Sequence, residues 1–223
     1  MDLLRLPFVL AAATGMHVAV TAPHTATSDE RVSSSTFREA VIARTVIASH
    51  LFTVTLIWSV ALGEVVAILF PASVPLRRPP PTLPVLYVVG SLLITAAGIL
   101  RKLCYRTLGR FFTFELSIQR EHKLLTKGPY SFVRHPSYTG TLLLTIGVFL
   151  MQGNPDSWLR TSGILAFTPL KILLLFWGSV AVVMTAGLFA RAAHEDRLMR
   201  DQFGEEWNRW ARVVRYRIVP GIY

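Results

Sequence analysis

Long apolar runs, separated by short polar or basic segments, constrain this 223-residue chain more than any other feature of its sequence. Hydrophobic residues make up 52% of the chain and charged residues only 16%, and the mean hydropathy is +0.47. Soluble domains are less apolar than this, and a helix needs about 20 consecutive apolar residues to cross a bilayer. The sequence therefore predicts an all-α, polytopic membrane helix bundle whose apolar faces contact the lipid bilayer.

Five apolar runs are candidates for transmembrane helices, at residues 3–22, 41–70, 83–100, 138–151 and 169–190. The first run has a charge before a short apolar core, so a cleaved signal sequence is the alternative to the retained span that we favour. We expect a single membrane domain over residues 1–223. Its parts are the first three spans (1–100), a basic connector (101–136), the last spans (137–190) and an amphipathic tail (191–223).

The connector is the most basic part of the chain, with Arg101, Lys102, Arg106, Arg110, Arg120, Lys123, Lys127 and Arg134. Because cationic loops stay on the cytosolic side, the connector is predicted to be cytosolic, and five spans place the tail on the same side. The net charge of +10 thus belongs beside apolar segments, as juxtamembrane charges do. We therefore expect no nucleic-acid partner.

A few side chains within or near these runs have simple structural interpretations. Glu64 lies near one end of the second run, where an interfacial charge is favoured over a polar lining of the bundle. Cys104 is the only cysteine, which excludes an intramolecular disulfide and zinc-finger spacing and indicates a structural residue. In the tail, Trp207 and Trp210 follow on an amphipathic helix and are predicted to be headgroup anchors.

The segment from Lys127 to Gly140 reads K-G-P-Y-S-F-V-R-H-P-S-Y-T-G. Pro136 disfavours the α conformation for His135 and suits a first helical turn, so a helix is predicted to begin at Pro136. Free N–H groups and the positive dipole end at a helix start favour a carboxylate or phosphate. We interpret the segment as an anion-binding cofactor loop at a membrane surface.

Arg191 and Glu195 stand four residues apart where the fifth run ends, so they share one face of a continuing helix. The simpler interpretation is a surface ion pair that contributes a few tenths of a kcal/mol. The alternative is a pair of fixed charges at a membrane exit, one for an anionic and one for a cationic ligand group. The anion-binding loop favours this alternative.

These motifs together resemble the isoprenylcysteine carboxyl methyltransferases, membrane enzymes that use S-adenosylmethionine. The resemblance covers about half of the chain, C-terminal to the third run. It rests on H-K-L-L-T at 122–126, G-P-Y at 128–130, R-H-P-S-Y at 134–138 with Gly140, N-P at 154–155, and Arg191, Glu195-Asp196 and F-G-E-E at 203–206. The chain departs from the family pattern at Trp207, where tyrosine is usual, and at His194, where an acidic residue is common.

The resemblance implies roles for individual residues. A loop around the cofactor would comprise His122, Lys123, Leu124, Leu125 and Tyr130, and a turn at the amino-acid end of the cofactor would comprise His135, Pro136, Ser137 and Tyr138. Glu195 would receive the cofactor's ammonium group. Arg191 would meet the substrate carboxylate, as the substrate-binding and catalytic residue. No metal is implied.

The expected function is S-adenosylmethionine-dependent methyl esterification of the C-terminal carboxylate of prenylated cysteine. The substrates would be prenylated protein C-termini or small prenylcysteines, and the enzyme would lie in the endoplasmic reticulum membrane with its active site facing the cytosol. Two alternatives are a phospholipid methyltransferase that acts on an amine headgroup and a non-catalytic membrane scaffold. An amine substrate would require an acidic or aromatic cage in place of Arg191.

The five-span arrangement predicts that the connector and the tail face the cytosol and that the loop around Arg77 and Arg78 faces the lumen. A glycosylation site inserted into the tail should stay unmodified, since the glycosylation machinery is lumenal. The same site inserted into the Arg77-Arg78 loop should be modified and serves as the positive control. A glycosylated tail would contradict the five-span count.

Overall fold

The computed structural model describes residues 2–21, 37–70, 72, 83–112 and 124–223, with only the backbone described for 37–49. These residues form helices and connecting coil, which confirms the all-α prediction. In chain order the elements are η1 (Asp2–Leu4), α1 (Arg5–Val20), α2 (Phe37–Leu69), α3 (Val85–Leu108), η3 (Gly109–Phe111), η4 (Gly128–Ser131), α4 (Pro136–Gly153), α5 (Trp158–Thr161), η5 (Ile164–Ala166), α6 (Thr168–Phe203) and α7 (Glu205–Val213).

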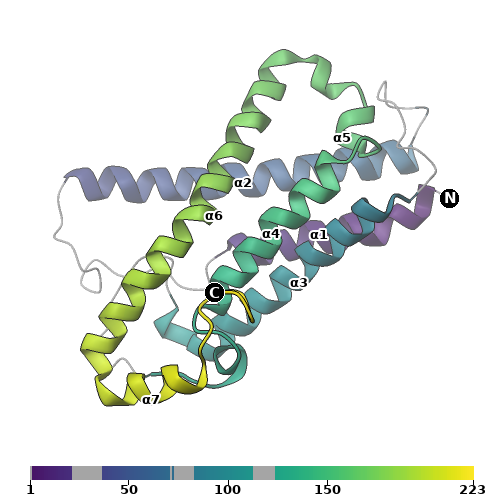
Figure 1. Ribbon diagram of the computed structural model, residues 1–223. Helices are drawn as coiled ribbons and strands as arrows, with labels where there is room; N and C mark the ends of the chain where they lie inside the picture. The colour runs from purple at the N-terminus through teal and green to yellow at the C-terminus, as the bar shows by residue number, and fades with distance from the viewer. Residues whose placement is uncertain (1, 22–36, 71, 73–82, 113–123) are drawn as a thin grey trace.

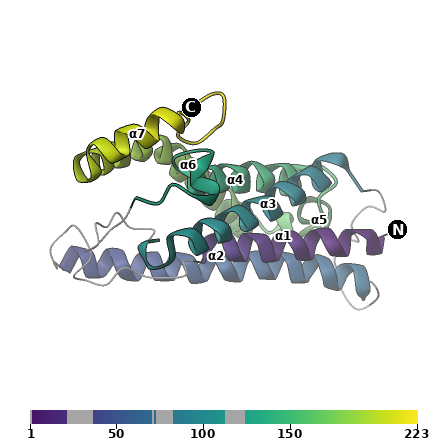
Figure 2. The same ribbon diagram turned by 90° about the horizontal axis from the view of Figure 1, so that it is seen from below.

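Helix α3 is the centre of the bundle, and α1 and α4 pack against it (Figures 1 and 2). Small residues allow these helices to approach closely, as is common between membrane helices. Gly15 of α1 faces Gly98 of α3, and a Cβ atom at Gly98 would lie 2.6 Å from the Gly15 Cα. Gly90 and Gly147 make a similar contact between α3 and α4. The glycines therefore set the spacing of the three helices.

One buried polar cluster joins α1, α2 and α3. Glu64 is fully buried, and its Oε1 accepts a hydrogen bond from the Tyr87 hydroxyl at 3.0 Å. Arg5 Nη1 lies 3.5 Å from the same oxygen, and its guanidinium stacks over the Tyr87 ring at 4.8 Å. The prediction of an interfacial Glu64 is therefore wrong. Helices α1 and α3 supply a cation and a hydroxyl donor, which offset the cost of removing the carboxylate from water.

Three helices among the described residues are long and apolar enough to cross a bilayer, at His50–Leu69, Val85–Phe111 and Thr168–Phe203. The last of these, α6, has 36 residues and is thus roughly 54 Å long, well beyond the ~30 Å hydrocarbon core. Only 6% of its most apolar stretch is buried within the protein. Its outward-facing leucines, valines and phenylalanines indicate an integral membrane protein. The count of five spans stays a prediction.

Two helix boundaries differ from the sequence-based expectation. Helix α3 continues past the expected end at Leu100 to Leu108, so Arg101 lies inside a helix and is buried. Residues 191–203 of the tail continue α6, but the whole tail is not one helix, because Gly204 adopts a φ of 52°, a conformation that favours glycine, and separates α6 from α7. The predicted start of α4 at Pro136 is confirmed.

Replacing Gly98 by alanine should force α1 and α3 apart, since the added Cβ meets the backbone of Gly15. We expect a loss of about 1–3 kcal/mol in the free energy of unfolding, the usual cost of overpacking. Thermal unfolding of the purified protein in detergent measures the change. The control is Gly187→Ala on α6, where a Cβ meets open space and helix propensity favours alanine. Equal Tm values for the two variants would contradict the close-packing assignment.

Candidate active site between α4 and α6

The segment after α7 pairs with the start of α4 (Figure 1). The Arg134 N–H donates to the Tyr216 carbonyl at 2.9 Å, and the His135 N–H donates to the Arg217 carbonyl at 2.7 Å. The Thr139 hydroxyl adds a third bond, to the Ile218 carbonyl at 2.5 Å. These bonds satisfy backbone groups on both segments and hold the C-terminal segment beside the first turn of α4.

Arg101 of α3 holds the start of α4 in place through hydrogen bonds. Its Nη1 donates to the Ser137 carbonyl at 3.1 Å and to the Thr141 hydroxyl at 2.6 Å, while its Nε donates to the Ala19 carbonyl at 2.6 Å. The side chain passes over Gly140, where a Cβ would lie 2.7 Å from the Arg101 Cγ. Sequence reasoning placed Arg101 in the connector and so missed this role, in which it links α1, α3 and α4.

His135 lies between two carboxylates that are consecutive in α6. Its Nδ1 is 3.4 Å from Glu195 Oε2, and its Nε2 is 3.0 Å from Asp196 Oδ1. Both ring nitrogens can donate to these oxygens only when the imidazole is protonated. Burial lowers the pKa of His135, but the hydrogen bonds and charges of Asp196 and Glu195 outweigh it and raise this pKa above the ordinary 6.5. The geometry therefore favours an imidazolium that joins α4 to α6.

Glu195 contacts the other side chains that the sequence predicted to act together with it. The Tyr138 hydroxyl donates to its Oε1 at 2.6 Å, and Arg191 Nε donates to the same oxygen at 2.8 Å. The His135 and Tyr138 rings stack with centroids 5.4 Å apart. The side chains of Glu195 and Arg191 are 17% and 35% exposed, respectively. The Arg191–Glu195 pair is thus part of a half-buried network, and its interpretation as a simple surface ion pair is wrong.

Asp196 is the acceptor on the other side of His135. Its Oδ2 accepts a hydrogen bond from Arg217 Nε at 2.7 Å and forms an ion pair with Arg134 Nη1, 3.0 Å away. Arg217 Nη1 also donates to the Tyr223 hydroxyl at 3.0 Å. The sequence analysis did not predict roles for Arg217 and Tyr223. Arg217 pairs with Asp196, 21 residues earlier in the chain, and no short sequence motif predicts such a pair. The only signal was the position of Asp196 next to Glu195.

The remaining predicted site residues lie outside this network. Tyr130, Pro136 and Ser137 are buried, and Tyr130 packs with the fully buried Cys104 beneath the site. Leu124 and Leu125 are half-buried in the coil before η4. The predictions for His122 and Lys123 concern positions outside the described residues.

The apolar helices and the charged network together define an integral membrane protein with a polar site where α4 begins and α6 passes its apolar stretch. The sequence model of the isoprenylcysteine carboxyl methyltransferase family matches residues 89–200, which is half of the chain. These residues include α4, the network residues of α6 and Arg101. The chain belongs to this family.

Two curated methyltransferases agree with this assignment, and a sterol reductase shows a weaker similarity. Protein-S-isoprenylcysteine O-methyltransferase B of Arabidopsis thaliana is 34% identical over 127 residues, covering 56% of this chain and 55% of the relative. A probable protein-S-isoprenylcysteine O-methyltransferase of Oryza sativa subsp. indica is 33% identical over 56% of this chain and 57% of the relative. A Delta(14)-sterol reductase of Mus musculus is 28% identical over 45% of this chain and 20% of the relative. The chain thus spans about half the length of the methyltransferases it matches, and no solved structure matches it.

The raised pKa of His135 predicts a pH-dependent contribution to stability. Because the pKa of His135 is higher in the folded than in the unfolded protein, protonation of His135 stabilises the fold. This stabilisation is fully present below pH 6.5, the ordinary pKa of histidine, and is lost as the pH rises through the folded-state pKa. The Tm difference between wild type and His135→Gln should therefore be largest near about pH 6 and shrink toward about pH 9. His194→Gln, at an exposed position of α6, is the control and should show no such trend. A Tm difference for His135→Gln that is constant across this range would contradict the imidazolium assignment.

Proposed function

We propose that this protein transfers a methyl group from S-adenosylmethionine to the C-terminal carboxylate of a prenylcysteine. The substrates are prenylated protein C-termini or small prenylcysteines, and the enzyme works in the endoplasmic reticulum membrane with its site facing the cytosol. The observation that carries the proposal is the network of Arg191, Glu195, Tyr138 and His135. It fixes a cation and a carboxylate side by side, directly after the apolar stretch of α6. The names of the family and of its relatives support the same reaction.

The residues present fit the charged end of S-adenosylmethionine. Glu195 Oε1 accepts two hydrogen bonds, and Oε2 lies 3.4 Å from His135 Nδ1. A carboxylate has about four acceptor positions, so Glu195 could also accept from an ammonium group. The positive charge of His135 and the dipole at the N-terminus of α4 would attract the carboxylate of the same ligand. When bound, the cofactor supplies a sulfonium-linked methyl group that is already activated for transfer.

The chain's own residues then have to orient the substrate and exclude competing groups, because a carboxylate is a nucleophile at neutral pH and needs no general base. Arg191 suits a carboxylate, since its planar guanidinium can bind two oxygens. Its bond to Glu195 holds the guanidinium in one orientation. Such alignment can lower the barrier by about 7–11 kcal/mol when the reacting atoms are near attack geometry.

The position of the network at the end of the apolar stretch of α6 suits a lipidated substrate. The exposed apolar face of α6 borders the bilayer, from which a prenyl chain would approach, while the charged network lies beyond the apolar stretch. The product is a neutral methyl ester. Removal of a terminal charge strengthens the membrane binding of a lipidated chain, which gives the reaction a physical purpose.

Arg191→Gln separates esterification from the two alternatives. For a farnesylcysteine analogue, kcat/KM should fall by an amount equivalent to about 2–4 kcal/mol of transition-state stabilisation, because the substrate carboxylate loses its partner in a partly desolvated site. Affinity for S-adenosylmethionine, measured by calorimetry, should change much less in this variant. In Glu195→Ala that affinity should fall strongly, since the ammonium group loses a charge-assisted acceptor.

The matched control is Arg197→Gln, at an exposed position of the same helix, which should retain both binding and turnover. Full esterification by Arg191→Gln would refute the assignment of Arg191. Methylation of phosphatidylethanolamine in place of the prenylcysteine analogue would favour the amine-headgroup alternative, and absence of cofactor binding by the folded wild type would favour a scaffold.

A further inference from the structure

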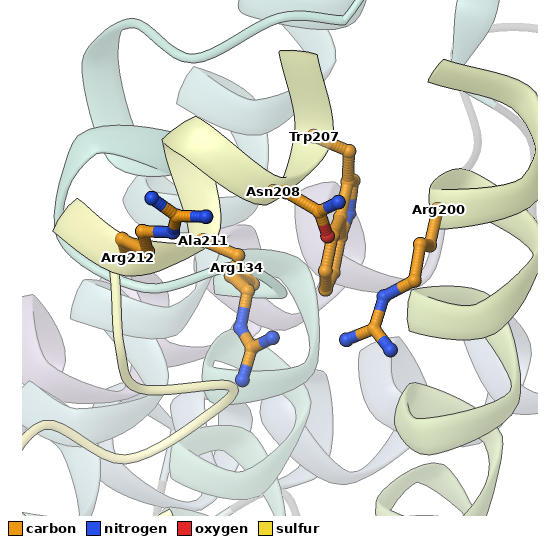
Figure 3. Close-up of a pocket in the computed structure, with 6 residues that line it drawn as sticks. All are labelled: Arg134, Arg200, Trp207, Asn208, Ala211 and Arg212. Atoms are coloured by element: carbon orange, nitrogen blue, oxygen red, sulfur yellow. The ribbon is translucent and has the colours of Figure 1, made fainter. Parts of the chain in front are cut away.

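A cavity of about 440 Å³ lies between α6, α7 and the segment that leads into α4 (Figure 3). Its lining consists of Arg134, Arg200, Trp207, Asn208, Ala211 and Arg212. Three of these six residues are arginines and none is acidic. We call this cavity the arginine pocket. It is separate from the network around Glu195, although Arg134 contributes to both through Asp196.

Trp207 organises two of the arginines. Its side chain is buried, so the prediction that it anchors in lipid headgroups is wrong for this residue. The guanidinium carbons of Arg134 and Arg200 lie 5.6 and 4.7 Å from the centre of its ring, and the two side chains flank the ring in Figure 3. The negative face of the indole attracts each cation. The ring therefore holds two like charges near one another at one end of the pocket.

Arg134 is the fixed member of the set, and Arg200 and Arg212 are the exposed members. Only 12% of the Arg134 side chain is exposed, and it is held by Asp196 and by the Arg215 carbonyl at 3.1 Å. Exposed arginines beside a fixed one can close on a ligand from solvent, while the buried one determines where the ligand binds.

The local charges do not balance without a ligand. Asp196 serves Arg134, Arg217 and His135, so one carboxylate is shared among three cations. Burial and the neighbouring Arg217 and Arg200 lower the pKa of Arg134, with Asp196 acting in the opposite direction. The buried Nε of Arg134 also has no acceptor within the part of the chain that the structure describes. The lining of the pocket therefore carries three positive charges and no negative charge.

We propose that the arginine pocket binds a phosphate group. A tetrahedral phosphate has enough acceptor oxygens for several guanidinium forks at once. Asn208 also lines the pocket, and its amide donates to Glu205 Oε1 at 3.2 Å. Two sources present this chemistry: the headgroup of an anionic phospholipid and a soluble phosphate ester. Phe132 and Val213, two and one residues from Arg134 and Arg212 in the sequence, expose large apolar side chains, which a site at a membrane surface would use. The site lies outside the proposed methyl-transfer reaction.

The test measures two probes on the full-length protein in a neutral detergent at fixed ionic strength. The probes are inorganic phosphate and a short-chain phosphatidic acid below its micellar concentration, titrated by calorimetry. In the double variant Arg200→Gln/Arg212→Gln, affinity should fall at least tenfold, because two charge-assisted contacts are lost. Binding of the lipid alone identifies a headgroup site, and binding of both probes with similar affinity identifies a site for soluble phosphate esters.

The control is the double variant Arg197→Gln/Arg209→Gln, which removes the same charge from exposed positions that do not line the pocket. It should retain wild-type affinity. Equal losses in both double variants would show a general surface field and overturn the proposal, as would the absence of binding to the wild type. Displacement of the phosphate probe by S-adenosylhomocysteine would assign the pocket to the cofactor site and also overturn it. Failure of the methyl-transfer assay would leave these outcomes unchanged.

Discussion

The contact of His135 with two consecutive carboxylates, Glu195 and Asp196, is the interaction on which the site depends. Because one imidazolium serves both acceptors, it ties the first turn of α4 to α6. Each carboxylate then recruits a different set of partners, with Arg191 and Tyr138 on one and two arginines on the other. A neutral imidazole could donate to only one of them. The protonation of a single residue therefore couples the face proposed for methyl transfer to the tail.

Helix length explains why such a charged network can exist in so apolar a chain. Helix α6 is longer than the hydrocarbon thickness, so one continuous helix provides both a lipid-facing surface and a polar end. The network can then be rigid, because its carboxylates are extensions of a transmembrane element. Arg101 gives α4 a comparable support from inside the bundle, where its charge is satisfied by backbone carbonyls and hydroxyls.

Cations exceed anions throughout this end of the molecule, and the two proposed sites use the excess differently. Around Glu195 and Asp196 each positive group faces a carboxylate at close range, which orients the side chains. In the arginine pocket the ring of Trp207 substitutes for anions, since its face attracts the guanidinium groups of Arg134 and Arg200. An aromatic face stabilises cations without neutralising them, so the attraction for an external anion remains.

The sequence alone determined the all-α membrane class, the start of α4 at Pro136 and the shared face of Arg191 and Glu195, because hydropathy, proline geometry and helical periodicity are local properties. Only the tertiary structure decided which distant groups meet. Glu64 is buried because Arg5 and Tyr87 contact its carboxylate, and Asp196 is buried with an ion pair to Arg217. No local pattern encodes such pairs, since they form only when packing removes water and each buried charge has to find a partner.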